Sequence, residues 1–272
     1  MNIINPPPHP HKTFQTPQTS RGSALIIILV AVALFGALSY VVAGMMRADS
    51  GINAISEQQA GLHASAILSY ASSVRRAVQD VRISNGCEET QLSFEKPPFD
   101  NSDSYRNANS PSDFSCHIFH PDGGGVSASQ PSIELQDAVE AAARSGILEE
   151  YLITASIQIP AVGTGDTATF GSDSEATTDT EILLILPWLN ERICRKINED
   201  INVSDDTMPT FQSYTQFFAD HRAKFVGVFP SNRSSAGNHT LIRAESSFCA
   251  YDPTPGSVPG GGYHLYYTLM AR

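Results

Sequence analysis

The chain has no acidic residue before Asp49, and no charge of either sign lies between Arg21 and Arg47. Residues 48–272 therefore hold all 28 Asp and Glu residues but only 14 of the 17 Lys and Arg residues, which leaves a net charge of −14. Contacts with phosphate groups need clustered Lys and Arg. This acidic portion argues against nucleic acid as a partner.

Familiar chemical motifs are also absent. No CxxC pair, Cys/His ligand cluster, G-x-S-x-G, H-E-x-x-H or phosphate-binding glycine loop occurs, so we expect no enzyme, no metal and no cofactor. Two weaker candidates for metal binding are spaced only loosely like ligands: His117, His120 and Asp122 in one group, and Asp166, Asp173, Glu175 and Asp179 in an acidic stretch that calcium would suit. A strand or loop with flanking Cys and Pro explains the first group at least as well, and a solvated loop is the favoured explanation of the second.

The uncharged run between Arg21 and Arg47 is the strongest signal in the sequence. Its 25 residues would form a helix roughly 37 Å long, against a hydrocarbon core of about 30 Å. A secretory signal has an apolar core of only about 7 to 15 residues. The pattern predicts a transmembrane helix over 23–46 behind a disordered, proline-rich segment 1–22, and Lys12 with Arg21 favours a cytoplasmic N-terminus.

The helical pattern continues beyond the apolar run. Residues 47–84 contain no proline, and an apolar stripe recurs at steps of three and four: Ile67, Tyr70, Val74, Val78 and Val81. Asn85 and Gly86 end it. We expect one helix from about Ser23 to Ser84, with its second half packed on the domain that follows.

The remaining residues, 85–272, predict a single α+β domain with a mostly antiparallel sheet and two or more shorter helices. The expected elements are a loop-rich segment 87–125, a helix 132–146 with Ser132 as N-cap, a strand within 151–163, an acidic loop 163–180, a buried strand 181–187 ended by Pro187, a helix 188–201, and a C-terminal hairpin formed by 239–252 and 263–271.

All four cysteines follow the apolar run: Cys87, Cys116, Cys194 and Cys249. An even count fits two disulfides in an oxidising compartment, although four cysteines allow three pairings, and four buried free thiols are the alternative. We expect Cys87 to pair with Cys116 and Cys194 with Cys249.

A short basic leader ending in glycine, a lipid-spanning helix and a Cys-stabilised α+β head together resemble a type IV pilin or a type II secretion pseudopilin. The stretch RGSALIIILVAVALFGALSYVVAG carries this resemblance, and GCEETQLSFEKP, CHIFHPDGGGV, LPWLNERICRKINEDINV and YHLYYTLMAR also resemble pilin-like proteins of proteobacteria. The resemblance implies that prepilin peptidase cuts after Gly22, so that Ser23 becomes the N-terminus. Gly36 and Gly44 then lie close to where the helix of many pilins melts during assembly.

One position departs from the family pattern. Major pilins have a glutamate as the fifth residue after the cut, and here that position is Ile27. A carboxylate in hydrocarbon is costly unless paired, and in pilins it pairs with the amino terminus of a neighbouring subunit. Ile27 removes both the cost and the contact, which suits a minor subunit. Ser23 also replaces the more usual Phe or Met.

The expected function is therefore a structural subunit of a type IV pilus or type II secretion system, held in the bacterial inner membrane with its head in the periplasm. Its partners would be prepilin peptidase and other pilin or pseudopilin subunits. One alternative is an uncleaved single-pass membrane protein that displays a periplasmic binding domain. Another is an anchored periplasmic enzyme, for which the sequence shows no convergent acid, base or nucleophile.

Overall fold

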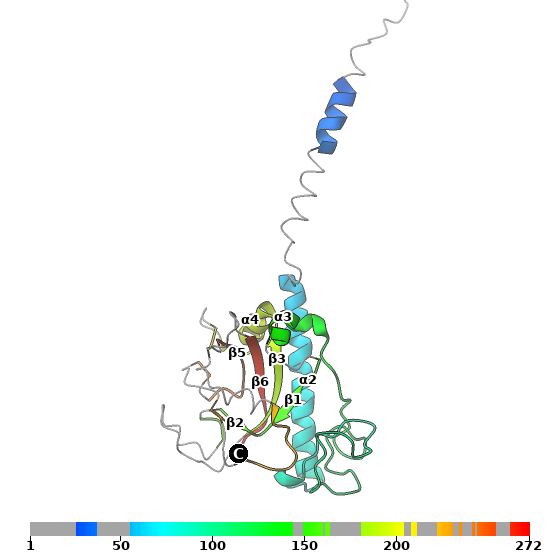
Figure 1. Cartoon of the computed structure of the whole chain (residues 1–272), viewed down its shortest axis with the longest axis vertical. Coiled ribbons are helices and arrows are strands. Elements are labelled where there is room, and N and C mark those ends of the chain that lie inside the picture. The colour runs from blue at the N-terminus through cyan, green and yellow to red at the C-terminus, as the bar shows by residue number, and fades with distance from the viewer. Residues whose placement is uncertain are drawn as a thin grey trace, which may run out of the picture. The chain divides into compact units, whose positions relative to one another are not determined.

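The structure of the 272-residue chain is a computed structural model. It describes residues 26–36, 55–143, 149–159, 161–163, 181–203, 208–210, 222–230, 234–235, 241–242, 244–253 and 262–272. The chain divides into two compact units, Met1–Ala54 and Ile55–Arg272. In the first unit residues 26–36 are helical. The second unit, called the head below, contains all the strands drawn in Figure 1.

The longest helix of the head is α2, Glu57–Ser84, and its sequence explains its packing. The residues it buries recur at steps of three and four: Ala60, Ala64, Ile67, Ala71, Val74, Ala77, Val78 and Val81. Small alanines let the helix approach the sheet closely, and α2 lies along the sheet in Figure 1. Asn85 caps the helix and Gly86 follows with a φ of 66°. The predicted stripe and the predicted end are both confirmed.

The start of α2 differs from the prediction of one helix from Ser23 to Ser84. Ser56 is extended, with ψ at 156°, and forms a capping box with Gln59. The Ser56 side chain accepts a hydrogen bond from the Gln59 backbone N–H, while the Gln59 side chain accepts one from the Ser56 N–H. Arg192 also donates to the Ile55 carbonyl at 2.7 Å. The helix on the sheet therefore begins at Glu57, and the single continuous helix was a wrong prediction at this point.

The sheet has four antiparallel strands in the order β1-β3-β6-β5. The strands are β1 (Leu152–Thr154), β3 (Ile182–Leu189), β5 (Ser247–Asp252) and β6 (Gly262–Met270). Strands β5 and β6 form the predicted C-terminal hairpin. Two short strands, β2 (Ile157–Gln158) and β4 (Ser234–Ser235), pair in parallel outside this sheet. The head is thus an α+β unit with a long helix on a mostly antiparallel sheet, as expected.

Both faces of β3, one of the two inner strands, are buried, which explains why its sequence is apolar without interruption. On β3, Leu184 and Leu186 belong to the core cluster that contains the buried residues of α2. Leu183 and Ile185 belong to a second cluster, together with Phe248 and other residues. Successive residues of a strand point to opposite faces, so a strand covered on both sides has no polar alternation.

Two predicted boundaries are wrong near Pro187. Strand β3 continues to Leu189 through a register shift after Leu186, so Pro187 does not end it. The following helix, α4 (Glu191–Asp200), begins after the N-cap Asn190, whose side chain accepts from the Arg192 N–H. Proline has no N–H to donate to a neighbouring strand, so within a sheet it is tolerated at irregularities such as this one, where the regular pairing is interrupted. Consequently Trp188 lies in the strand, not in the helix.

The helix predicted over 132–146 is divided in the structure. A short 3-10 helix, η2 (Ile133–Leu135), follows the N-cap Ser132 as expected. Gln136 is then extended and forms an isolated bridge with Leu189 before α3 (Ala138–Ala143) begins. The segment 87–125 is rich in turns as predicted and contains the 3-10 helix η1 (Glu89–Gln91).

The described outer edges of the four-stranded sheet are hydrogen-bonded to other parts of the head. On β1, the Ile153 N–H donates to the Tyr105 hydroxyl at 3.0 Å, and the Phe225 N–H donates to the Ile153 carbonyl at 2.9 Å. On β5, the Asn198 side-chain amide bonds both backbone groups of Cys249, each at 2.8 Å. These contacts occupy groups that an open edge would present to another strand.

Candidate functional site

The helical segment 26–36 is apolar around its whole circumference. Its large side chains are 50% to 74% exposed: Ile26, Ile27, Ile28, Leu29, Val30, Val32, Leu34 and Phe35. Gly36 has open space around it. A helix that is hydrophobic all round is normally buried in lipid or between other helices. Within its own unit this segment has no such cover among the described residues.

Two of the predicted assembly residues, Ile27 and Gly36, lie on this segment, and Ile27 is 65% exposed. Gly22, Ser23 and Gly44 lie outside the described residues, as do most of the predicted transmembrane helix and the acidic loop with its four carboxylates. Searched over the described residues only, the structure contains no helix with the length and apolar character that crossing a membrane requires.

The four cysteines form the two expected disulfides, Cys87–Cys116 and Cys194–Cys249. The first closes a loop within the turn-rich segment that follows α2, and the second joins α4 to β5. All four residues are buried. Because α4 also packs on α2, the second bridge connects three elements of the head around one core cluster.

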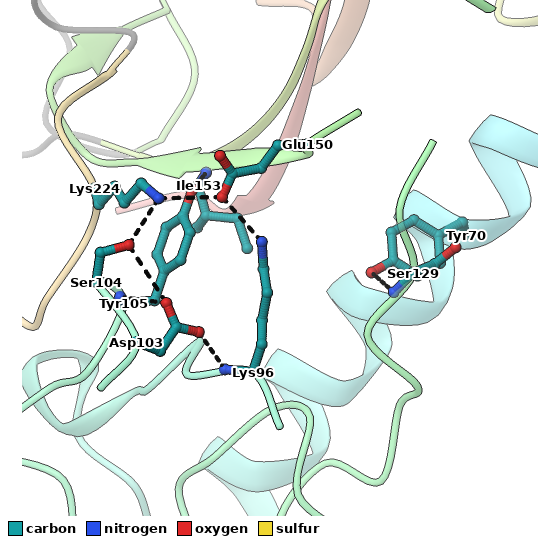
Figure 2. A network of polar contacts seen from close by, with 9 residues as sticks. All are labelled: Tyr70, Lys96, Asp103, Ser104, Tyr105, Ser129, Glu150, Ile153 and Lys224. Atoms are coloured by element: carbon teal, nitrogen blue, oxygen red, sulfur yellow. Dashed lines mark hydrogen bonds and ion pairs between the residues drawn. The ribbon is translucent and has the colours of Figure 1, made fainter. Parts of the chain in front are cut away.

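A polar network around Tyr105 ties the turn-rich segment to the sheet (Figure 2). Lys96 and Lys224 both donate to one carboxylate oxygen of Glu150, at 3.0 and 3.1 Å. Their ammonium groups lie 5.0 and 4.5 Å from the centre of the Tyr105 ring, close enough for cation–π attraction. Burial raises the pKa of Tyr105, so its hydroxyl keeps its proton while it accepts from Ile153. This network therefore stabilises the fold by joining the turn-rich segment to the sheet.

A second polar group lies in the same turn-rich segment and was not foreseen. The Ser110 Oγ is 3.3 Å from His117 Nδ1, and His117 Nε2 is 3.4 Å from Glu95 Oε2. The other Glu95 oxygen accepts from the Asn101 N–H at 2.9 Å. Glu95 and His117 are buried, whereas Ser110 is partly exposed. The three side chains thus lie in series from the interior to the surface, with a hydrogen bond between Ser110 and His117 and a polar contact between His117 and Glu95.

His117, His120 and Asp122, the candidate metal ligands of the turn-rich segment, make other contacts in the structure. His117 binds Glu95, while His120 stacks on Phe114 and its Nδ1 lies 3.6 Å from Asp122 Oδ2. In the part of the chain that the structure describes, no group of three or more His, Cys, Asp or Glu residues could hold a metal ion.

Sequence patterns could not have identified the Ser110, His117 and Glu95 group, because no short motif connects these residues. They are brought together by a parallel bridge between Ser93 and His117, beside the Cys87–Cys116 disulfide. The closest available signal was the histidine itself, which the spacing suggested for a different role.

Comparisons with known proteins identify no relative: no protein-family model, curated protein or solved structure matches the chain.

Proposed function

We propose that the chain is a pilin-like structural subunit, anchored in the bacterial inner membrane by its N-terminal apolar helix, with its disulfide-stabilised head in the periplasm. The observation that carries this proposal is the segment 26–36, whose large apolar side chains are at least half exposed around the helix. Exposed apolar surface of this extent needs lipid or the apolar helices of other subunits as its environment.

The head supports the same proposal. A long helix packed on an antiparallel sheet, next to a disulfide that closes a C-terminal region, is the arrangement that the resemblance to pilins and pseudopilins implies. Disulfides fit an oxidising compartment. Ile27, in place of the assembly glutamate, favours a minor subunit of a type IV pilus or type II secretion system over a major one.

Processing of the leader tests this proposal directly. The full-length chain, with a C-terminal tag, is expressed in cells with and without prepilin peptidase, and its intact mass is measured. We expect loss of residues 1–22 only when the peptidase is present. Gly22→Leu should block the cut, whereas Gly36→Leu, a matched change beyond the cut, should leave it unaffected. An intact Met1 in both strains would contradict the proposal of a pilin-like subunit.

The alternative is an uncleaved single-pass protein that displays a periplasmic binding domain. The capping box at Ser56 favours it, because a head that begins with its own helix cap does not need a continuous helix from the membrane. The same mass measurement separates the two functions, since only the alternative retains residues 1–22 in the membrane-bound protein.

A further inference from the structure

The group formed by Ser110, His117 and Glu95 has the order of contacts that activates a serine. Ser110 Oγ reaches one ring nitrogen of His117 at 3.3 Å, and Glu95 reaches the other at 3.4 Å. In the tautomer that carries the ring proton on Nε2, His117 points this proton toward the Glu95 carboxylate oxygen, which can accept it. The Nδ1 atom is then the acceptor for the Ser110 hydroxyl proton. A nucleophile, a base and a group that orients the base are thus within hydrogen-bonding reach of one another.

The three side chains differ in exposure in the way that this role needs. Glu95 is 2% exposed and is held from its other oxygen by the Asn101 N–H. His117 is 5% exposed, and burial lowers the pKa of His117 below its ordinary value of 6.5, so the ring is neutral at pH 7 and can accept a proton. Ser110 is partly exposed, so a molecule from solvent can reach it.

Two phenylalanines near the group have a strained backbone. Phe99 and Phe114 are among the eight described non-glycine residues with a positive φ, at 60° and 62°, whereas Asn101, at 68°, is of a type that adopts this conformation readily. A bulky residue in this conformation costs about 1–3 kcal/mol, and such residues gather at functional sites. Asn101 is the donor to Glu95, while Phe114 packs against His117 with ring centres 5.0 Å apart.

An aromatic surface lies beside the His117 ring. Phe99, Phe114 and His120 are partly exposed, with His120 stacked on Phe114 at 4.3 Å and meeting the edge of Phe99 at 4.8 Å. The exposed carboxylate of Asp113 also acts on His117. An apolar acyl group would pack on these rings, and the acidic side chain would disfavour an anionic one.

From this geometry we propose that Ser110 is a nucleophile, with His117 as its base and Glu95 as the positioning residue, and that it accepts the acyl group of a small uncharged ester. Ser110 Oγ bonds to the ester carbonyl carbon as its proton passes to His117 Nδ1. The alcohol then leaves with that proton, so an ester of Ser110 remains. Water attacks this ester by the same route, gives up a proton through His117, and releases the carboxylic acid with Ser110 restored.

The test uses the purified full-length chain in detergent micelles with an uncharged alkyl fluorophosphonate, a probe that reacts with activated serines. Peptide mapping should find one adduct, on Ser110, absent from Ser110→Ala and from protein unfolded in urea. His117→Gln should slow labelling by about 100-fold or more, the usual contribution of a general base. Ser115 is the matched control: it lies in the same segment and bonds to the Asp113 carboxylate at 2.7 Å, so Ser115→Ala should label normally.

A second measurement separates positioning from folding. The labelling rate should rise with pH as His117 loses its proton; the charged groups acting on this ring are Glu95, His120 and Asp113. Glu95→Gln should slow labelling and move the midpoint of this profile, while Glu95→Asp restores part of the rate; circular dichroism checks that each variant is folded. Labelling that is absent, equal in unfolded protein, or unchanged in folded His117→Gln would overturn the proposal. None of these results bears on cleavage after Gly22.

Discussion

The segment 26–36 and α2 are both helical, but they differ in where their apolar side chains lie and in how far these side chains are exposed. In α2 eight apolar residues form one buried stripe, and residues such as Ile67 and Val74 are almost completely buried against the rest of the head. In the segment 26–36 the large apolar side chains occupy every side and remain at least half exposed. The partner of α2 is therefore the described head itself, whereas for the segment 26–36 we propose lipid or the helices of other subunits as the cover. Each prediction below changes one side of this comparison and leaves the other as its control.

The largest effect should come from the disulfide that holds α4, a neighbour of α2, to β5. Replacing Cys194 and Cys249 by alanine opens a loop of 55 residues. In the chain-entropy description this loss costs about 4 kcal/mol. Guanidinium denaturation should show it as a lower midpoint. Extraction of the protein from membranes should be unchanged, because the apolar segment contains no cysteine.

A single truncation on the buried stripe should have a smaller effect. Ile67→Ala removes a side chain that is 2% exposed and should lower the free energy of unfolding by about 3 kcal/mol. Leu62→Ala, on the same helix but 72% exposed, should change it by less than about 0.5 kcal/mol. Ile28→Ala should leave unfolding of the head unchanged. Equal losses for Ile67→Ala and Leu62→Ala would mean that α2 does not bury the stripe described.

The cap where the head begins should contribute less again. Ser56→Ala removes one half of the capping box and should destabilise α2 by about 1 kcal/mol. Ser65→Ala, at an exposed position within the helix, is the matched control. Thermal unfolding followed at 222 nm distinguishes the two. If both variants unfold alike, α2 does not depend on the cap, and the helix would be expected to continue through Ser56.

The smallest expected effect is a dependence of the stability of the head on pH. Burial lowers the pKa of His117, so the unfolded chain takes up a proton at a pH where the folded head does not. The free energy of unfolding should therefore be highest above about pH 6.5, where His117 is neutral in both states. It should decline as the pH falls from there toward the pKa of His117 in the folded head. Urea denaturation at pH 7.5, 6.5 and 5.5 measures this decline, and His117→Gln should reduce it. Segment 26–36 has no titratable side chain to respond.

Local patterns predicted the head well where one periodicity dominated. The stripe from Ile67 to Val81, the buried strand β3 and the C-terminal hairpin all follow from the spacing of apolar residues. The prediction failed where a short-range cap competed with a long pattern. The signal for a helix start was present in Ser56 and Gln59, but the absence of proline favoured a continuous helix.

The polar groups of the head could not be predicted in the same way. Lys96, Glu150 and Lys224 meet around Tyr105 from positions far apart in the chain, and Glu95 meets His117 across a disulfide-bonded loop. Such contacts depend on tertiary structure, which single-sequence periodicity does not encode. The predicted disulfide pairing is confirmed: the first two cysteines of the chain pair with each other, and so do the last two.

The bonded edges of the sheet affect how the protein tolerates crowding. Tyr105 and Phe225 at β1, and Asn198 at β5, occupy backbone groups that could otherwise recruit a strand from another molecule. Heads brought close together in a narrow compartment would then meet through side chains and would not grow into cross-β aggregates. Tyr105→Phe combined with Asn198→Ala should free the Ile153 N–H and the two backbone groups of Cys249 and make aggregation at high concentration faster, which light scattering would detect.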